Sequence, residues 1–248
     1  MKDYRPPPDL LAKRIILVTG AAAGIGKAAA LAFARYGATV VLLDRRERDL
    51  EAVYDEIERG GGRQPAIIPL DLASATIEHH DGVHLQIERE FGRLDGLLHN
   101  AAELGALAPI ELYDLSLWNK VLSVNLQAPL LLTRACLPLL KKSQDASIVF
   151  TSADVGRKGR AYWGAYGVSC FAIEGLMQIL ADELEANTNI RVNSLDPGPV
   201  RTALRARAYP GEDASALPEP AAIMPVYLYL MGPDSQGVTG ETHSAQTP

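Results

Sequence analysis

RIILVTGAAAGIG, residues 14–26, is the stretch that decides the fold of this chain. Its first five residues form a short apolar run, which is typical of a buried β-strand. Gly20, Gly24 and Gly26 follow, directly before the Ala-rich segment 27–36. Glycines permit a tight turn, and the N-terminus of a helix offers free N–H groups and a positive dipole end. The stretch therefore predicts a strand–turn–helix unit that binds a pyrophosphate.

Asp44 strengthens the interpretation of this turn as a dinucleotide site. It lies 20 residues after Gly24, at the end of the apolar run 39–43. A carboxylate in this place binds the hydroxyls of an adenosine ribose. It favours NAD, because it repels the 2′-phosphate of NADP, whereas Arg45 and Arg46 could pair with that phosphate. We expect NAD, with NADP as the alternative.

Strand-like and helix-like segments alternate along the chain. The expected strands are residues 14–18, 39–43, 66–70, 94–99, 147–151, 190–195 and a short one near Thr242. The expected helices are residues 27–36, 48–59, 77–90, 114–140, 165–185 and 221–231. Pro129 is expected to bend the fourth helix. This rhythm, without a long linker, predicts a single-domain α/β fold over residues 1–248, a Rossmann-type doubly wound parallel sheet with helices on both faces.

Two segments fall outside this alternation. Residues 1–10 are polar and rich in proline, and we expect a flexible N-terminal arm. Residues 201–219 read as a loop-rich excursion, which we expect to line the substrate pocket. Their mixed Arg, Tyr and Pro content selects no substrate.

Composition excludes several classes of function. The 248 residues are 48% hydrophobic and carry a net charge of −6, which argues against binding to nucleic acid or to anionic membranes. No apolar stretch is long enough to span a membrane. Two cysteines without a disulfide framework favour a cytoplasmic location. His80 and His84 are spaced four residues apart, but too few ligands share their face, so no metal site is expected.

The spacing of the glycines, Gly-x3-Gly-Ile-Gly over residues 20–26, resembles that of the short-chain dehydrogenase/reductase family. The resemblance covers almost the whole chain. Segments 156–166 and 224–232 resemble a bacterial branch of that family, the YciK-like oxidoreductases. The matching positions for cofactor binding are Gly20, Gly24, Ile25, Gly26, Asp44, Arg45, Asp71, Leu72, Asn100, Ala101, Tyr166, Pro197, Gly198, Val200 and Thr202.

The resemblance implies a reaction and a set of catalytic residues. A hydride would pass between a nicotinamide cofactor and a carbonyl compound or secondary alcohol, a small-molecule substrate. Tyr166 would give or take the proton, Asn125 would order a relay water, and Ser152 would hydrogen-bond the substrate. The family also implies a homodimer or homotetramer.

Two positions depart from the family pattern. The family has a lysine four residues after the tyrosine, where this chain has Cys170, and a serine thirteen residues before it, where this chain has Ala153. A free tyrosine has a pKa of about 10, and a thiol supplies no positive charge to favour the phenolate. Ser152 either turns inward to replace the serine or merely ends a strand.

Three functions remain open. The first is an NAD(P)-dependent oxidoreductase with impaired or altered catalysis. The second is a catalytically decayed dinucleotide-binding or sensor protein. The third is an interaction role through the two long helices, which the glycines and Asp44 disfavour.

Overall fold

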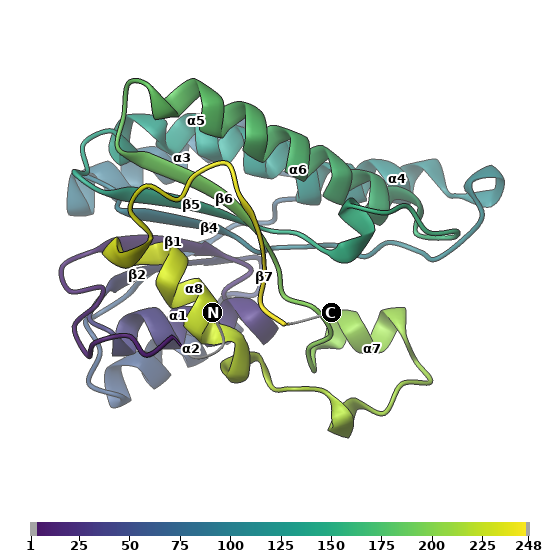
Figure 1. Cartoon of the computed structure of the whole chain (residues 1–248), viewed down its shortest axis with the longest axis horizontal. Coiled ribbons are helices and arrows are strands. Elements are labelled where there is room, and N and C mark those ends of the chain that lie inside the picture. Colours follow the sequence, from purple (N-terminus) through teal and green to yellow (C-terminus); the bar gives the residue numbers. More distant parts are fainter. Residues whose placement is uncertain (1–3, 247–248) are drawn as a thin grey trace.

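A computed structural model describes residues 4–246, which form one parallel sheet flanked by helices (Figure 1). The strands follow the order β3-β2-β1-β4-β5-β6-β7. They are β1 (Ile15–Thr19), β2 (Thr39–Asp44), β3 (Ala66–Pro69), β4 (Gly96–His99), β5 (Ala146–Thr151), β6 (Ile190–Asp196) and β7 (Thr242–Ser244). The predicted fold class, a single-domain doubly wound parallel sheet, is confirmed.

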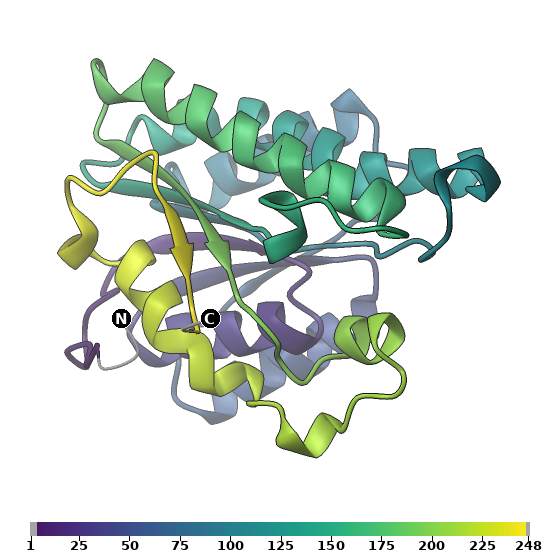
Figure 2. The ribbon, with the colours of Figure 1, turned by 45° about the vertical axis from the view of Figure 1, so that its right-hand side comes forward.

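Helices cover both faces of the sheet (Figures 1 and 2). One face carries α1 (Gly24–Arg35), α2 (Glu47–Arg59) and α8 (Met224–Met231). The other carries α3 (Ile77–Phe91), α5 (Ala128–Leu140) and α6 (Gly164–Glu185). Successive strand residues point to opposite faces, so Ile16 and Val18 pack with the first group and Leu17 with the second. The near-continuous apolar strands are the consequence of burial on both sides.

The order of the strands reverses between β1 and β4, since β2 and β3 lie on one side of β1 and the later strands on the other. A doubly wound sheet has a crevice outside the carboxyl ends of the strands at such a point. The Thr19 hydroxyl holds this junction together. Its oxygen accepts from the backbone N–H groups of Asn100 at 2.9 Å and Ala101 at 3.1 Å.

The segment expected as one helix over residues 114–140 is divided. α4 (Leu115–Leu122) and α5 are joined by a π-helical turn, Ser123–Gln127. Pro129 lies in the first turn of α5 and has no N–H, so the carbonyl of Asn125 loses its usual donor four residues on. A wider turn accommodates that loss, and the expected bend at Pro129 takes this form.

Residues 1–10 were expected to form a flexible arm; residues 4–10 contact the rest of the fold, while residues 1–3 lie outside the described range. The Tyr4 hydroxyl donates to Asp234 at 2.7 Å, and its ring meets that of Tyr229 edge-on at 5.4 Å. Leu10 is buried beside α8 and its flanking turns, with its side chain against Gly232. The prolines mark turns and not disorder.

The loop-rich segment 201–219 contains a short helix, α7 (Ala203–Ala208), which the sequence analysis did not predict. Thr202 begins it, because its hydroxyl accepts from the N–H of Arg205 at 3.2 Å. Among the described residues, α6 is the one helix with the length and apolar composition of a membrane span, but half of that stretch is buried inside the fold.

Candidate functional site

The glycine turn between β1 and α1 makes room for a dinucleotide backbone. Gly20 and Gly24 have left-handed φ angles of +68° and +54°, which residues with a side chain rarely adopt. A Cβ on Gly26 would lie 2.1 Å from the Gly20 carbonyl oxygen and 2.6 Å from the Asn100 amide nitrogen. Gly26 therefore has no room for a side chain, Gly20 and Gly24 adopt backbone conformations that favour glycine, and the N-terminus of α1 faces the crevice. These features fit a bound pyrophosphate.

A cleft of about 820 Å³ runs along the carboxyl ends of the strands, from Asp44 to Tyr166. That size suits a dinucleotide and a small substrate together. It brings together most residues predicted from the sequence. They are Gly20, Gly24, Ile25, Asp44, Arg45, Asp71, Leu72, Asn100, Ala101, Ser152, Tyr166, Pro197, Gly198, Val200 and Thr202. Gly26 and Asn125 do not line it, because Gly26 lies behind the turn and Asn125 lines a smaller cavity.

The Asp44 carboxylate, at the end of β2, already accepts hydrogen bonds from the protein itself. Its carboxylate accepts from the backbone N–H of Arg46 at 3.1 Å and from that of Ala22 at 3.4 Å. The Arg46 guanidinium adds a third contact at 3.4 Å. Arg45, by contrast, is exposed and faces the same cleft. The carboxylate is thus partly balanced by one arginine, while the other remains open to an anion.

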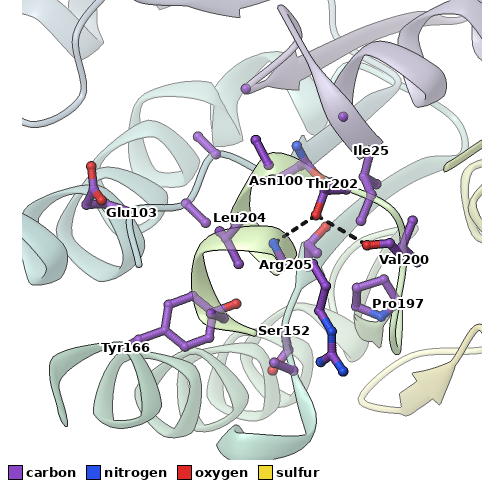
Figure 3. A pocket seen from close by; sticks show the side chains of 18 of the residues that line it. Ile25, Asn100, Glu103, Ser152, Tyr166, Pro197, Val200, Thr202, Leu204 and Arg205 are labelled. Atoms are coloured by element: carbon purple, nitrogen blue, oxygen red, sulfur yellow. Dashed lines mark hydrogen bonds between the residues drawn. The ribbon is translucent and has the colours of Figure 1, made fainter. Parts of the chain in front are cut away.

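The segment after β6 lies over the glycine turn. The Asp196 carboxylate accepts from the N–H of Gly198 at 2.8 Å, and the Gln246 amide donates to the carbonyls of Pro197 and Pro199. These bonds place Thr202 beside the turn, 3.5 Å from where a Cβ of Gly24 would lie. Figure 3 shows Thr202, Val200 and Ile25 grouped at this end of the cleft.

Tyr166 and Cys170 lie one turn apart on α6, and both are buried. Burial raises the pKa of Tyr166 well above its ordinary value of 10.0, and the adjacent Cys170 thiol and the carboxylates of Asp196 and Asp154 raise it further. Burial also raises the pKa of Cys170 to about 12. Both groups are therefore neutral at physiological pH. Tyr166 is therefore a hydroxyl donor here, since within residues 4–246 the groups that shift its pKa all raise it.

Ser152 lines the cleft on the same side as Tyr166 (Figure 3), and Ala153 lines it as well. The Ser152 side chain is buried, and within residues 4–246 its hydroxyl finds no hydrogen-bond partner. A buried hydroxyl without a partner is uncommon in folded proteins. The unpaired hydroxyl therefore favours a role for Ser152 in binding a ligand. It disfavours the alternative that Ser152 merely ends β5.

Asn125 sits in the π-helical turn and is fixed by several hydrogen bonds. Its amide oxygen accepts from the N–H of Glu103 at 2.8 Å, and its amide nitrogen donates to the Glu103 carbonyl at 3.0 Å and the Ser169 hydroxyl at 3.1 Å. A cavity of about 30 Å³ lies between Asn125, Tyr166 and Cys170. That volume holds a water molecule.

Several further residues line the cleft that the sequence did not single out one by one. Trp163, Leu204 and Tyr209 line its far end together with Arg205 and Arg207. Arg157 and Arg160 line it as well. The spacing of Trp163, three residues before Tyr166, was the one available signal, since residues three apart share a helix face. Leu204, Arg205 and Arg207 lie on α7 and Tyr209 follows it, all within the segment 201–219 that was expected to line the substrate pocket, although the helix itself was not predicted.

Comparison with known proteins identifies the family. The model of the short chain dehydrogenase family matches residues 14–213. The uncharacterized oxidoreductase YciK of Escherichia coli (strain K12) is 51% identical over 243 residues, which cover 98% of this chain and 96% of that one. The chain therefore belongs to the short-chain dehydrogenases, and the resemblance to the YciK-like branch is confirmed.

Solved structures agree with this assignment. A chain from Pseudomonas syringae superposes with a TM-score of 0.97 at 57% identity, covering 98% of this chain and 99% of that one. A chain from Shigella flexneri 2a str. 301, complexed with NADP, superposes with a TM-score of 0.95 at 51% identity, covering 97% and 100%.

The glycine turn yields a direct prediction. Gly26→Ala should weaken dinucleotide binding at least roughly tenfold, because the added methyl group collides with the Gly20 carbonyl and pushes the turn open. Quenching of intrinsic fluorescence by the reduced dinucleotide measures the Kd, and circular dichroism confirms that the variant folds. Gly175→Ala is the matched control, since its methyl group meets no atom within 4 Å. Unchanged affinity in folded Gly26→Ala would contradict the site.

Proposed function

We propose that this protein is an NAD(P)H-dependent reductase of carbonyl compounds whose catalytic half lacks the usual positive charge. The observation that carries the proposal is the single cleft that joins the glycine turn and Asp44 to a buried Tyr166 hydroxyl. The residues present fit a nicotinamide dinucleotide, which would supply a hydride beside Tyr166 when bound. Membership of the short-chain dehydrogenase family supports the same chemistry.

Each catalytic residue has a role that its surroundings support. Tyr166 donates a hydrogen bond, and then a proton, to the carbonyl oxygen of the substrate. The Ser152 hydroxyl, which has no partner within residues 4–246, donates a second hydrogen bond to the same oxygen. Asn125 holds the wall of the small cavity behind Tyr166, from which a water molecule restores the proton. Cys170 contributes no charge to this set.

A second candidate function follows from the same electrostatics. A protein that binds the dinucleotide without turning it over would act as a sensor or a binding protein. The raised pKa of Tyr166 and the absence of a serine at Ala153 favour it over rapid catalysis. Turnover of a reactive carbonyl compound distinguishes a reductase from a sensor. A sensor binds the reduced dinucleotide equally well but does not oxidise it.

The cofactor that we propose is NADP(H), although Asp44 led the sequence analysis to NAD. The relative from Shigella flexneri contains NADP. In this chain, Arg46 partly neutralises Asp44, and Arg45 is free to meet a 2′-phosphate. A charge-assisted contact of this kind contributes about 1.5–3 kcal/mol.

NADPH should therefore bind at least about tenfold more tightly than NADH in a fluorescence titration. Arg45→Ala should weaken NADPH binding by roughly tenfold and leave NADH nearly unchanged, because only NADPH carries the phosphate. Arg48→Ala is the matched control, an exposed arginine on α2 that does not line the cleft. If NADH binds more tightly than NADPH, the proposal is wrong and NAD, which Asp44 favours, is the cofactor.

Cys170→Lys tests the missing charge. The lysine should reach the small cavity beside Tyr166, lower the pKa of the phenol and raise kcat on a panel of reactive diketones and aldehydes at least about tenfold. Cys170→Met is the control, because methionine extends the side chain without a charge. Rapid turnover by the wild type, with no gain in Cys170→Lys or an equal gain in Cys170→Met, would refute this reading of the site.

We also propose that the chain forms homodimers or homotetramers through the outer faces of α5 and α6. Val168, Phe171 and Ile179 are 46%, 46% and 60% exposed and follow one stripe of α6, and Leu130 on α5 is 47% exposed. An apolar stripe of this length is uncommon on a monomer.

A cytoplasmic location likewise stays a prediction.

Light scattering should show a mass of two or four times the 26.7 kDa of one chain. Phe171→Asp should release monomers, because it places a charge in the centre of the stripe. Leu85→Asp, on the exposed side of α3, should leave the mass unchanged. A wild-type monomer at micromolar concentration would contradict the proposal.

A further inference from the structure

The segment that covers the glycine turn has few backbone donors of its own. Residues 197–200 read Pro-Gly-Pro-Val, and neither proline has an N–H to donate. Gly198 has a left-handed φ of +68°, and glycine is the residue with the widest choice of backbone conformations. Its N–H donates to the Asp196 carboxylate at 2.8 Å. A segment of this composition needs contacts from elsewhere in the fold to keep one position.

Gln246 supplies such contacts from the chain that follows β7. Its amide nitrogen donates to the carbonyl of Pro197 at 2.9 Å and to that of Pro199 at 2.7 Å. The same side chain packs on Gly198, where an added Cβ would lie 3.0 Å from the Gln246 amide nitrogen. One side chain thus binds the residues on both sides of the glycine and holds the segment at its most flexible point.

The strand that leads to Gln246 is itself anchored to the fold. The last residues of a domain are usually mobile unless they are tied down. β7 pairs with β6 (Figure 1), and the N–H of Ala245 donates to the carbonyl of Asp196 at 2.9 Å. The Thr242 hydroxyl donates to the buried Glu174 carboxylate of α6 at 3.0 Å. Gln246 therefore extends from a fixed support.

Arg157 provides a further anchor from the loop that follows β5. Its guanidinium donates to the His243 carbonyl at 3.0 Å and to the Ser244 hydroxyl at 3.2 Å. It also lies 3.9 Å from the Glu174 carboxylate. The end of β7 is therefore bound to two loops, by Arg157 to the loop after β5 and by Gln246 to the loop after β6. Both loops line the cleft.

The position of the segment after β6 matters for the dinucleotide, because the segment lies against the glycine turn. Pro197, Val200 and Thr202 line the cleft (Figure 3). The Thr202 methyl group is 3.5 Å from where a Cβ of Gly24 would lie. If the two proline carbonyls lost their donor, the segment would be free to move away from the turn and open the cleft there.

We propose that Gln246 is a positioning residue for dinucleotide binding, which holds residues 197–202 against the glycine turn and slows the release of the bound dinucleotide. This inference rests on the proposed dinucleotide-dependent function. Gln246 acts through the segment and takes no part in the chemistry. Its effect is confined to the part of the dinucleotide that the segment covers, because the adenosine end lies at Asp44 of β2, and three strands separate β2 from β6.

Two substitutions test the hydrogen bonds of Gln246 separately from its shape. Gln246→Ala removes the side chain, and Gln246→Glu keeps the shape but replaces the donating NH2 group with an acceptor. Each should weaken binding of the preferred reduced dinucleotide roughly tenfold in a fluorescence titration. In stopped-flow measurements the loss should lie in the dissociation rate, as most differences between related complexes do. Gln236→Ala, at an exposed glutamine that does not line the cleft, is the matched control and should leave the Kd unchanged.

The adenosine fragment tests whether the effect is local. The fragment is adenosine 2′,5′-bisphosphate if NADPH is the preferred dinucleotide and AMP if NADH is. Its Kd for Gln246→Ala should stay within about twofold of the wild-type value in calorimetry. A substitution that merely loosens the fold would weaken the fragment and the dinucleotide together, and would lower the melting temperature further than Gln236→Ala does.

The outcomes distinguish the role of Gln246 from the proposed function. Wild-type affinity in Gln246→Ala or in Gln246→Glu would overturn the positioning role and leave dinucleotide binding intact, and so would an equal loss for the fragment and the dinucleotide. A wild type that binds neither NADPH nor NADH would contradict the proposed function itself, and the positioning role with it.

Discussion

The close contact inside the glycine turn is the constraint on which the rest of the site depends. Gly26 lies so near the Gly20 carbonyl and the Asn100 side chain that no Cβ fits, so α1 packs closely against the short turn, residues 20–23, that joins it to β1. Its N-terminus consequently faces the crevice where the sheet order reverses. The Thr19 hydroxyl ties the end of β4 to the same place. The segment around Thr202 then covers the turn and closes the cleft.

The two halves of the cleft differ in their electrostatics. At the dinucleotide half, the helix N-terminus and Arg45 provide positive potential for phosphates. At the catalytic half, burial, the Cys170 thiol and two carboxylates all act to keep Tyr166 protonated. Binding and turnover therefore depend on separate features of this chain.

The sequence was sufficient for the sheet, because apolar strands and glycine positions are local patterns. Most of the residues predicted to bind the cofactor follow the ends of those strands, and they line one cleft. It missed the ordered N-terminal segment, since the contact of Tyr4 with Asp234 joins distant parts of the chain. The π-helical turn depends on the missing N–H of Pro129 together with the bonds of Asn125, and no periodicity reveals it. The meeting of Trp163 and Tyr209 likewise exists only after α7 folds back.

The proposed function depends most directly on Tyr166 being a neutral hydroxyl, whose pKa its described surroundings raise. An ultraviolet difference titration of the folded wild type against Tyr166→Phe isolates the ionisation of this one phenol. The account predicts no ionisation of Tyr166 below about pH 10, the ordinary pKa of a tyrosine. An ionisation near neutral pH, present in the wild type and lost in Tyr166→Phe, would contradict it and would mean that another positive group replaces the lysine.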